Sequence, residues 1–364
     1  MRFFVFLFLI NFIPSFSYNN PIFTRKDILL GMPLVLISDN KNSNSYSNNN
    51  PYVIIGGGGY TGSDCVKALV NDKKMVRSVS RNPMKIGEID NNYVDYISAD
   101  ITKKETLDEP LKGAKAVIFT ANAIKKSEMT GKGNDFSNLK QSFTDISVMG
   151  LINVANSCIK NGVKRLIVIS ASCVSCSENP EAKFDKACGL SCAHCRAKKE
   201  GEKALKELFA VNPDFSYTIV RAGLLTTGEK RGVGEIELNQ DYSKTGMISR
   251  VDLADLCIKT IDNPNTYGTT FEAYYRDTIQ PIDVKKSLEM CVGLGKSVEE
   301  CFFGGYFKDK KPSSLDEAMK APLKNTLFAT GNEFNGKNWE ELFGGLKKDK
   351  NEEFDLFNLQ FGVS

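Results

Sequence analysis

The chain has 364 residues, of which 41% are hydrophobic and 25% are charged, a composition typical of a globular protein with one large domain or two small ones. Its 47 Lys and Arg residues nearly balance its 44 Asp and Glu residues, for a net charge of +3. A chain with so small a net charge is not strongly attracted to nucleic acid or to an anionic membrane. We therefore expect no nucleic-acid partner.

The first 50 residues are predicted to be a targeting segment and a linker. An apolar run at residues 3–16 has the length of a signal-peptide core and is short for a membrane span. A second, shorter apolar run covers residues 28–37, and the Asn/Ser-rich tract at 38–50 has the composition of a disordered linker. The mature protein is therefore expected to lack a stable transmembrane anchor.

This N-terminal arrangement resembles the bipartite presequences of algae with complex plastids. The resemblance implies delivery to a plastid, either to the stroma or, through the second apolar run, to the thylakoid. The alternative is the secretory pathway, with a signal peptide followed by an irregular linker.

From residue 51 to residue 282, apolar runs alternate with helical patterns. Seven runs have the continuous apolar character of strands covered on both faces: 53–55, 75–81, 94–101, 114–123, 163–172, 214–223 and 269–275. Helical spacing marks the segments 63–72, 139–162, 195–210 and 247–261. This alternation predicts an α/β fold of the Rossmann type, a doubly wound parallel sheet with helices on both faces. Residues 283–364 are predicted to be a small, mainly helical accessory segment.

A glycine-rich loop directly follows the first predicted strand. Its glycines keep a G-x-x-G-x-x-G spacing, which permits a sharp turn, a close approach of backbone to phosphate and tight packing of helix on strand. The following helix would offer its unpaired N–H groups to the phosphates. A flexible surface turn is the alternative, but the strand before and the helix after the loop favour a dinucleotide site. The cofactor residues predicted here are Gly56, Gly59, Tyr60, Thr61 and Gly62.

The second predicted strand ends in residues that favour NADP(H) over NAD. NAD-dependent enzymes place an acidic residue there for the ribose hydroxyls. This chain has Ser80 and Arg81 instead, and a guanidinium can form charge-assisted hydrogen bonds to a 2′-phosphate. A solvated surface arginine is the alternative interpretation of Arg81.

These motifs form part of a longer series. In chain order they are the glycine loop, SRNP, SADIT, FTANA, NGVKRLIVIS, KKEGEKAL, YTIVRAGLL and ISRVDLADL. Because these motifs occur in this order, the chain resembles the atypical short-chain dehydrogenases of the NmrA-like and isoflavone-reductase-like group, including plastid members. The resemblance extends from about Val53 to Glu272. The resemblance implies that Asp100 and Ile101 border the adenine, while Arg221 to Gly223 lie near the nicotinamide. It also implies that the segment after the fourth strand lines the cofactor, with Thr120, Ala121 and Asn122.

The same resemblance assigns catalytic positions, and here the chain departs from its relatives. They place a Tyr four residues before a Lys, so that both lie on one helix face and the ammonium lowers the tyrosine pKa. Here the Lys is most naturally Lys198, and His194 occupies the tyrosine position; a shift of one residue would instead pair Cys195 with Lys199. Three residues are thus catalytic candidates: Ser170 to polarise a carbonyl, His194 as a proton donor with a near-neutral pKa, and Lys198, which would also bind the nicotinamide ribose. The alternative is that catalysis has been lost.

Half of the ten cysteines cluster between residues 173 and 195. Two C-x-x-C pairs separated by fifteen residues match the spacing of a four-cysteine zinc site, and an iron–sulfur centre would use the same thiolates. The predicted metal ligands are Cys173, Cys176, Cys192 and Cys195. Disulfides or a redox-regulated dithiol are the competing interpretations. The remaining cysteines Cys65, Cys158, Cys257, Cys291 and Cys301 are expected to be small core residues.

The leading functional hypothesis is an NADP(H)-dependent oxidoreductase that acts on a small carbonyl, enone or quinone-like substrate. The second is a regulatory or assembly protein that binds NADPH without turnover and contacts a protein partner, as the resemblance to NmrA-like proteins suggests. A third is a redox-responsive or metal-responsive regulator built around the cysteine cluster.

Overall fold

The computed structural model describes residues 50–123, 140–176, 192–241, 244–281, 289, 292–295 and 331–350. All of them belong to the compact unit that runs from Ser47 to Ser364. The targeting segment predicted at residues 1–50 lies outside the described residues except for its last residue, as does most of the accessory segment predicted at 283–364.

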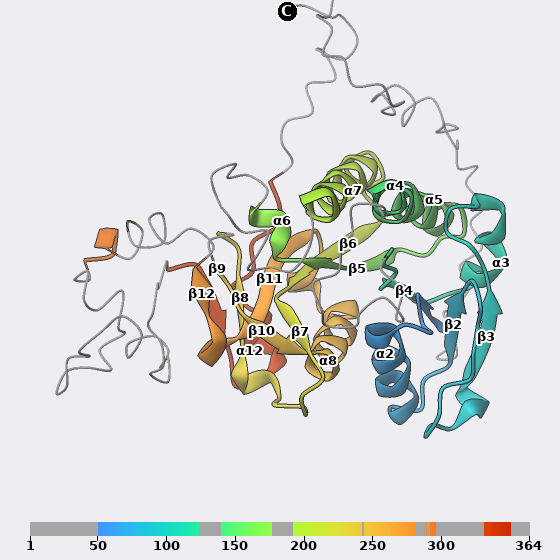
Figure 1. Ribbon diagram of the computed structural model, residues 1–364, viewed down its shortest axis with the longest axis horizontal. Helices are drawn as coiled ribbons and strands as arrows, with labels where there is room; N and C mark the ends of the chain where they lie inside the picture. The colour runs from blue at the N-terminus through green and yellow to red at the C-terminus, as the bar shows by residue number, and fades with distance from the viewer. Residues whose placement is uncertain are drawn as a thin grey trace, which may run out of the picture. The chain divides into compact units, whose positions relative to one another are not determined.

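The described residues form a central sheet of nine strands, most of them parallel (Figure 1). The order is β13-β8-β11-β6-β5-β4-β1-β2-β3, so the chain starts in the middle and builds outward in both directions. All seven predicted strands are present and parallel: β1 (Tyr52–Ile55), β2 (Val76–Ser80), β3 (Val94–Ser98), β4 (Ala116–Phe119), β5 (Arg165–Ala171), β6 (Ser216–Ala222) and β11 (Thr269–Tyr275). The predicted Rossmann sheet is confirmed.

Two antiparallel strands at one edge of the sheet were not predicted. The strand β8 (Ile236–Asn239) pairs with β11, and β13 (Glu333–Asn335) pairs with β8. The accessory segment therefore contributes a strand to the main sheet as well as the helix α12 (Trp339–Phe343). Strands of three or four residues are too short for a periodic pattern to reveal. Two small ribbons complete the described strands: β7 (Leu224–Thr226) with β10 (Met247–Ser249), and β9 (Lys244–Thr245) with β12 (Gln280–Pro281).

The helices cover the sheet on both faces (Figure 1). On one face lie α4 (Lys140–Thr144), a π-helical turn (Asp145–Gly150), α5 (Leu151–Lys160) and α7 (Cys192–Ala210); on the other lie α2 (Tyr60–Asn71) and α8 (Arg250–Ile261). Shorter helices are α3 (Asp108–Leu111) and α6 (Cys173–Cys176). Single 3₁₀ turns span Asn91–Tyr93, Lys104–Thr106, Val233–Glu235, Pro264–Thr266 and Arg276–Thr278. Within the described ranges, no helix combines the length and apolar content that a membrane crossing requires.

The core lies between the sheet and its helices, as the apolar strands require. Every residue of β1 and β4 is buried, and α2 turns Cys65, Val66 and Leu69 toward the sheet. The helix α5 ends where predicted, because Gly162 adopts a φ of +70°, which only glycine takes without strain. The predicted core positions of Cys65, Cys158 and Cys257 are confirmed, whereas Cys291 and Cys301 lie outside the described residues.

Candidate functional site

The glycine loop joins β1 to α2 at the carboxyl edge of the sheet. The backbone N–H groups of Gly56 and Gly57 both donate to the carbonyl oxygen of Val79, at 2.8 and 3.2 Å, which fixes the loop beside the end of β2. Gly59 is the N-cap residue of α2, and the first turn of that helix has only neutral residues. The N–H groups of this first turn carry the partial positive charge of the helix, and the turn itself contains no carboxylate to neutralise it.

The glycine spacing is required by close backbone contacts. Gly56 has a φ of +87°, and a Cβ atom at Gly62 would lie 2.1 Å from the carbonyl oxygen of Gly56. A Cβ atom at Gly57 would lie 2.4 Å from Ser78 Oγ on β2. The first and third glycines of the motif thus permit the turn and the packing of helix on strand, as predicted.

The last residue of β2, Ser80, has a hydroxyl group next to this loop that lacks a hydrogen-bond partner among the described residues. The Oγ atom of Ser80 is buried, and none of the described residues hydrogen-bonds to it. A Cβ atom at Gly58 would lie 3.6 Å from this oxygen, so the hydroxyl lies close to the loop. A buried polar atom without a partner is costly, and a ligand held over the loop would satisfy it. The observation fits a dinucleotide whose adenosine ribose lies at the end of β2.

Arg81 and Asp100 lie together at the ends of β2 and β3. The side chain of Arg81 is exposed, and the Ser98 hydroxyl donates to its carbonyl oxygen at 3.0 Å. Partial burial opposes ionisation of Asp100, but hydrogen bonds from Thr102 and the charges of Arg81 and Lys103 outweigh it, so the pKa of Asp100 is lowered. Arg81 thus places an exposed positive charge at this edge of the sheet, and its predicted contact with a 2′-phosphate stays a prediction.

The residues predicted after β3 and β4 play different local roles. Ile101 is buried against Gly150 of the π-helical turn, and its carbonyl oxygen accepts a hydrogen bond from Asn153 at 2.8 Å. Thr120 donates its hydroxyl to the Ile55 carbonyl oxygen at 2.9 Å and packs beneath the glycine loop. The backbone then continues through half-buried Ala121 to exposed Asn122. Thr120 thus supports the loop from below, and the predicted contacts of Ala121 and Asn122 with the cofactor stay predictions.

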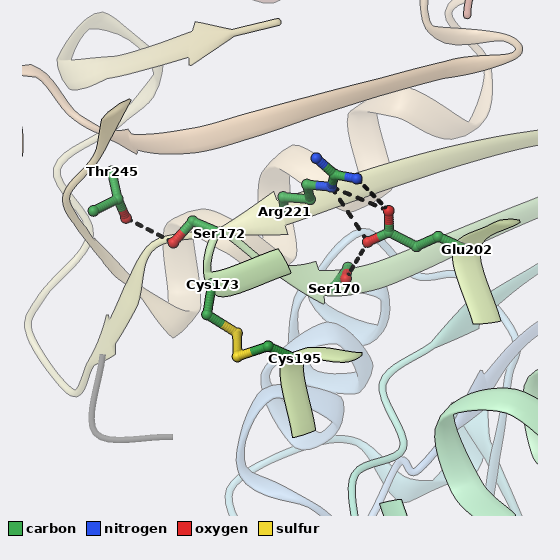
Figure 2. The surroundings of a disulfide bond; sticks show 7 residues. All are labelled: Ser170, Ser172, Cys173, Cys195, Glu202, Arg221 and Thr245. Atoms are coloured by element: carbon green, nitrogen blue, oxygen red, sulfur yellow. Dashed lines mark hydrogen bonds and ion pairs between the residues drawn. A yellow bond between two sulfur atoms is a disulfide. The ribbon is translucent and has the colours of Figure 1, made fainter. Parts of the chain in front are cut away.

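The second part of the site lies at the carboxyl ends of β5 and β6, under α7. Glu202 on α7 accepts a hydrogen bond from Ser170 Oγ at 2.5 Å and an ion pair from Arg221 Nη2 at 2.7 Å (Figure 2). Ser170 and Arg221 are register partners on the neighbouring strands β5 and β6. All three side chains are buried. The hydroxyl hydrogen of Ser170, predicted to polarise a carbonyl, is directed at Glu202 in this structure.

Lys198 lies one helical turn before Glu202 and reaches the same strand end. Its Nζ donates to the carbonyl oxygen of Ile169 at 3.3 Å, and its side chain is half-buried. Burial lowers the pKa of Lys198 to about 8, against the opposing effect of the Glu202 charge. An ammonium with such a pKa is mostly charged at neutral pH and can release a proton without a large penalty.

The predicted near-neutral pKa of His194 is wrong. The ring is buried and packs edge-on against Phe143, with 4.9 Å between ring centroids. Burial, together with the charge of Lys198, lowers the pKa of His194 to about 3. The imidazole is therefore neutral at physiological pH, which argues against a role as cationic proton donor.

The predicted four-cysteine metal site is contradicted by a disulfide. Cys173 at the start of α6 is bonded to Cys195 on α7, with their Cα atoms 5.7 Å apart (Figure 2). Two of the four proposed thiolates are thereby consumed, while the side chains of Cys176 and Cys192 lie outside the described residues. Among the described residues, no group of three or more His, Cys, Asp or Glu side chains gathers as a metal site would require. The competing disulfide interpretation is the one that the structure adopts.

The sequence interpretation missed the buried ionic contacts that surround Ser170. Arg221 also donates to Ser175 Oγ at 3.2 Å, and Ser175 donates to Glu272 on β11 at 2.6 Å. Glu272 is fully buried, and burial raises its pKa to about 8. The available signal was a charged residue inside each of two apolar strands, in YTIVRAG and TTFEAYY, because a charge buried in a sheet needs a partner.

Several solved structures are similar to this chain. The oxidoreductase ylbE from Lactococcus lactis is 21% identical, and the match covers 67% of this chain and 97% of that one, with a TM-score of 0.48. ChuY from Escherichia coli O157:H7, described as an anaerobillin reductase, is 17% identical over 63% of this chain and 98% of its own, with a TM-score of 0.47. A short-chain dehydrogenase/reductase from Veillonella parvula, solved in complex with NADP, is 14% identical over 63% and 96%, with a TM-score of 0.48.

Tetraketide alpha-pyrone reductase 2 from Arabidopsis thaliana is a similar curated protein. The two sequences are 27% identical over 133 residues, which is 34% of this chain and 39% of that protein. The match thus spans well under half the length of the relative.

A family profile matches the region that contains both parts of the site. The family is described as NAD(P)H-binding, and its profile matches residues 56–264, from the first glycine of the loop to beyond α8. This match covers more than half of the chain, and it agrees with the resemblance to atypical short-chain dehydrogenases. The chain therefore belongs to the NAD(P)H-binding family.

Proposed function

We propose that the protein is an NADPH-dependent oxidoreductase that reduces a small carbonyl, enone or quinone-like substrate. The observation that carries this proposal is the position of Lys198. Its ammonium lies at the carboxyl end of β5, on the same edge of the sheet as the glycine loop at the end of β1, with only β4 between the two strands. A dinucleotide-binding loop and a titratable proton donor are thus on the same side of the fold.

The cofactor would be held by groups already named. The loop from Gly56 to Gly62 and the N-terminus of α2 would bind the pyrophosphate, and Ser80 with Arg81 would bind the phosphorylated ribose. When bound, the reduced nicotinamide supplies a hydride to the substrate. The protein contributes orientation and the matching proton.

Lys198 is the proposed proton donor in place of the tyrosine that relatives use. As charge develops on the substrate oxygen, the ammonium gives up one proton to it and becomes a neutral amine. The neutral amine must then regain a proton from solvent before the next turnover. With a pKa of about 8, the donor is charged at neutral pH, and reduction should slow as the pH rises above that value. Lys198 would also hydrogen-bond the nicotinamide ribose.

A turnover assay tests this proposal. The purified protein is mixed with NADPH and a panel of aldehydes, ketones, enones and quinones, and oxidation of NADPH is followed by absorbance. We expect at least one class to be reduced with a rate that declines above about pH 8. Tight NADPH binding with no turnover across the panel would overturn the enzymatic assignment.

A second candidate function is an NADPH-binding regulatory protein of NmrA-like type. The observation that favours it is the hydrogen bond from Ser170 to Glu202, which directs the hydroxyl away from any carbonyl. In that case NADPH would bind without turnover and would change the affinity of the protein for a protein partner. The turnover panel separates the two functions.

We also propose that the protein acts in a plastid. The support is the order of an apolar core, a transit-like stretch and a second apolar run in the first 50 residues. Fusion of residues 1–50 to a fluorescent protein, expressed in an alga with complex plastids, should label the plastid. Label in the secretory pathway alone would favour the alternative.

A further inference from the structure

Glu202 makes more buried polar contacts than the reductase mechanism has so far used. One carboxylate oxygen accepts from Ser170 Oγ at 2.5 Å, and the other accepts from Arg221 Nη2 at 2.7 Å and Nε at 3.1 Å. Only 3% of Glu202 is exposed. Because a buried carboxylate must be compensated, the contacts with Ser170 and Arg221 hold it in one orientation.

The backbone of α7 fixes Glu202 relative to Lys198. The two residues are one helical turn apart and so share a helix face. Between them, Gly201 allows the helix to pack closely, since a Cβ atom there would lie 1.9 Å from the carbonyl oxygen of Ser147 in the π-helical turn. The helix cannot slide or rotate without losing this contact, so packing fixes how Glu202 and Lys198 face the strands β5 and β6.

Glu202 is the carboxylate whose charge opposes the lowering of the Lys198 pKa, and it lies on the same face of α7. On α7 itself the ionisable groups of that face are His194, which is neutral, and Glu202. The elements packed against α7 contribute Asp145 from the π-helical turn and Arg221 from β6, while Arg165 lies at the opposite end of β5. Arg221 is paired with Glu202 at 2.7 Å, and the same carboxylate acts on Lys198 through its charge from one helical turn away.

We propose that Glu202 is a positioning residue of the reductase: it anchors the Ser170 hydroxyl and Arg221 and supplies the counter-charge of the Lys198 ammonium. Glu202 touches neither substrate nor cofactor and acts through Lys198. The inference depends on the proposed function only for the catalytic use of Lys198, since an effect of the Glu202 charge on Lys198 does not require turnover.

The test measures the titration of Lys198 directly in the full chain. The lysines are reductively methylated with ¹³C-formaldehyde, and the Lys198 signal is identified by its loss in Lys198→Arg. Its titration is then compared in the wild type, in Glu202→Gln and in Glu200→Gln. Glu200 is exposed on the opposite side of the same helix, so its substitution removes the same charge without the contact. We expect Glu202→Gln to lower the midpoint by at least about half a pH unit and Glu200→Gln to leave it unmoved.

A second variant is needed in case Glu202→Gln misfolds, because that substitution leaves the buried Arg221 without its ionic partner. Glu202→Gln combined with Arg221→Met replaces the ion pair with neutral chains of similar length. The midpoint should again fall relative to the wild type, and the alkaline limb of the turnover profile should fall with it. An unchanged midpoint in the folded variants would overturn the role of Glu202. If the midpoint falls but the wild type reduces none of the substrates, the proposed function fails while the effect of Glu202 on Lys198 stands.

Discussion

The two parts of the site differ in how far apart their residues lie along the chain. The cofactor loop is local: the seven consecutive residues from Gly56 to Gly62 link β1 to the first turn of α2, and the next strand, β2, ends at Ser80, just before Arg81. The region under α7 brings together Ser170, Glu202, Arg221 and Glu272 from four separate elements. The first part depends on backbone shape and the second on buried charge. This difference determines which part a sequence pattern can predict and which perturbations each part should tolerate.

The largest effect on nucleotide affinity is expected in the local part, from Gly62→Ala. The new Cβ atom would lie 2.1 Å from the Gly56 carbonyl oxygen, so α2 must shift and the loop must open. We expect NADPH affinity to fall by about 100-fold or more, equivalent to about 3 kcal/mol. Calorimetric titration gives the affinity, and Gly234→Ala, where a Cβ meets open space, is the matched control. Equal affinity in Gly62→Ala and Gly234→Ala would contradict the tight turn.

In the region under α7, Lys198→Met should reduce turnover more than it reduces binding. Loss of a general acid typically lowers kcat by about 10²- to 10⁴-fold. The pH profile should also lose its alkaline limb near pH 8, because the protonated amine that is active below this pKa is gone. Steady-state kinetics at saturating NADPH checks both effects. A larger loss of kcat in His194→Gln than in Lys198→Met would return the proton-donor role to His194.

The disulfide should stabilise the second part and leave the first part unchanged. It closes a loop of 22 residues between α6 and α7, for which chain entropy predicts about 3 kcal/mol of stability. Cys173→Ser with Cys195→Ser should therefore lower the free energy of unfolding by that amount, measured by urea denaturation. Cys158→Ser, at a buried free thiol, is the control for the loss of sulfur. If dithiothreitol lowers the stability of the double variant as much as that of the wild type, the assigned pairing is wrong.

The smallest effect is expected at the exposed Arg81. In the proposed complex its guanidinium would contact the 2′-phosphate, so Arg81→Ala should weaken NADPH binding by about 10-fold and leave NADH binding unchanged. Titration of both nucleotides at fixed ionic strength makes the comparison. If NADPH binding and NADH binding are weakened equally, Arg81 attracts both nucleotides through its charge and does not recognise the 2′-phosphate.

The sequence predicted the sheet and the cofactor loop because their determinants are contiguous. Continuous apolar runs identified all seven parallel strands, and the glycine spacing located Gly56 and Gly62. It did not predict the short antiparallel strands β8 and β13, since three or four residues carry no period. Nor did it predict the pairing of Glu202 with Arg221, which depends on the packing of α7 over β6.

The cysteine spacing and the single histidine were misleading for a related reason. Two C-x-x-C pairs are equally compatible with a metal and with a disulfide, and only the distance between Cys173 and Cys195 decides between them. The pKa of His194 depends on its burial against Phe143, which no local pattern records. Buried electrostatics follows from tertiary packing, so it is the part of a site that sequence reasoning predicts least well.

The central claim is that a glycine-lined turn, with Ser80 and Arg81 at its side, binds a phosphorylated adenine dinucleotide. Parallel titrations of the purified protein with NADPH and NADH, followed by nucleotide fluorescence, test it most directly. The account predicts saturable binding of NADPH with an affinity at least about 10-fold tighter than that of NADH. Failure to bind either nucleotide at millimolar concentration would contradict it.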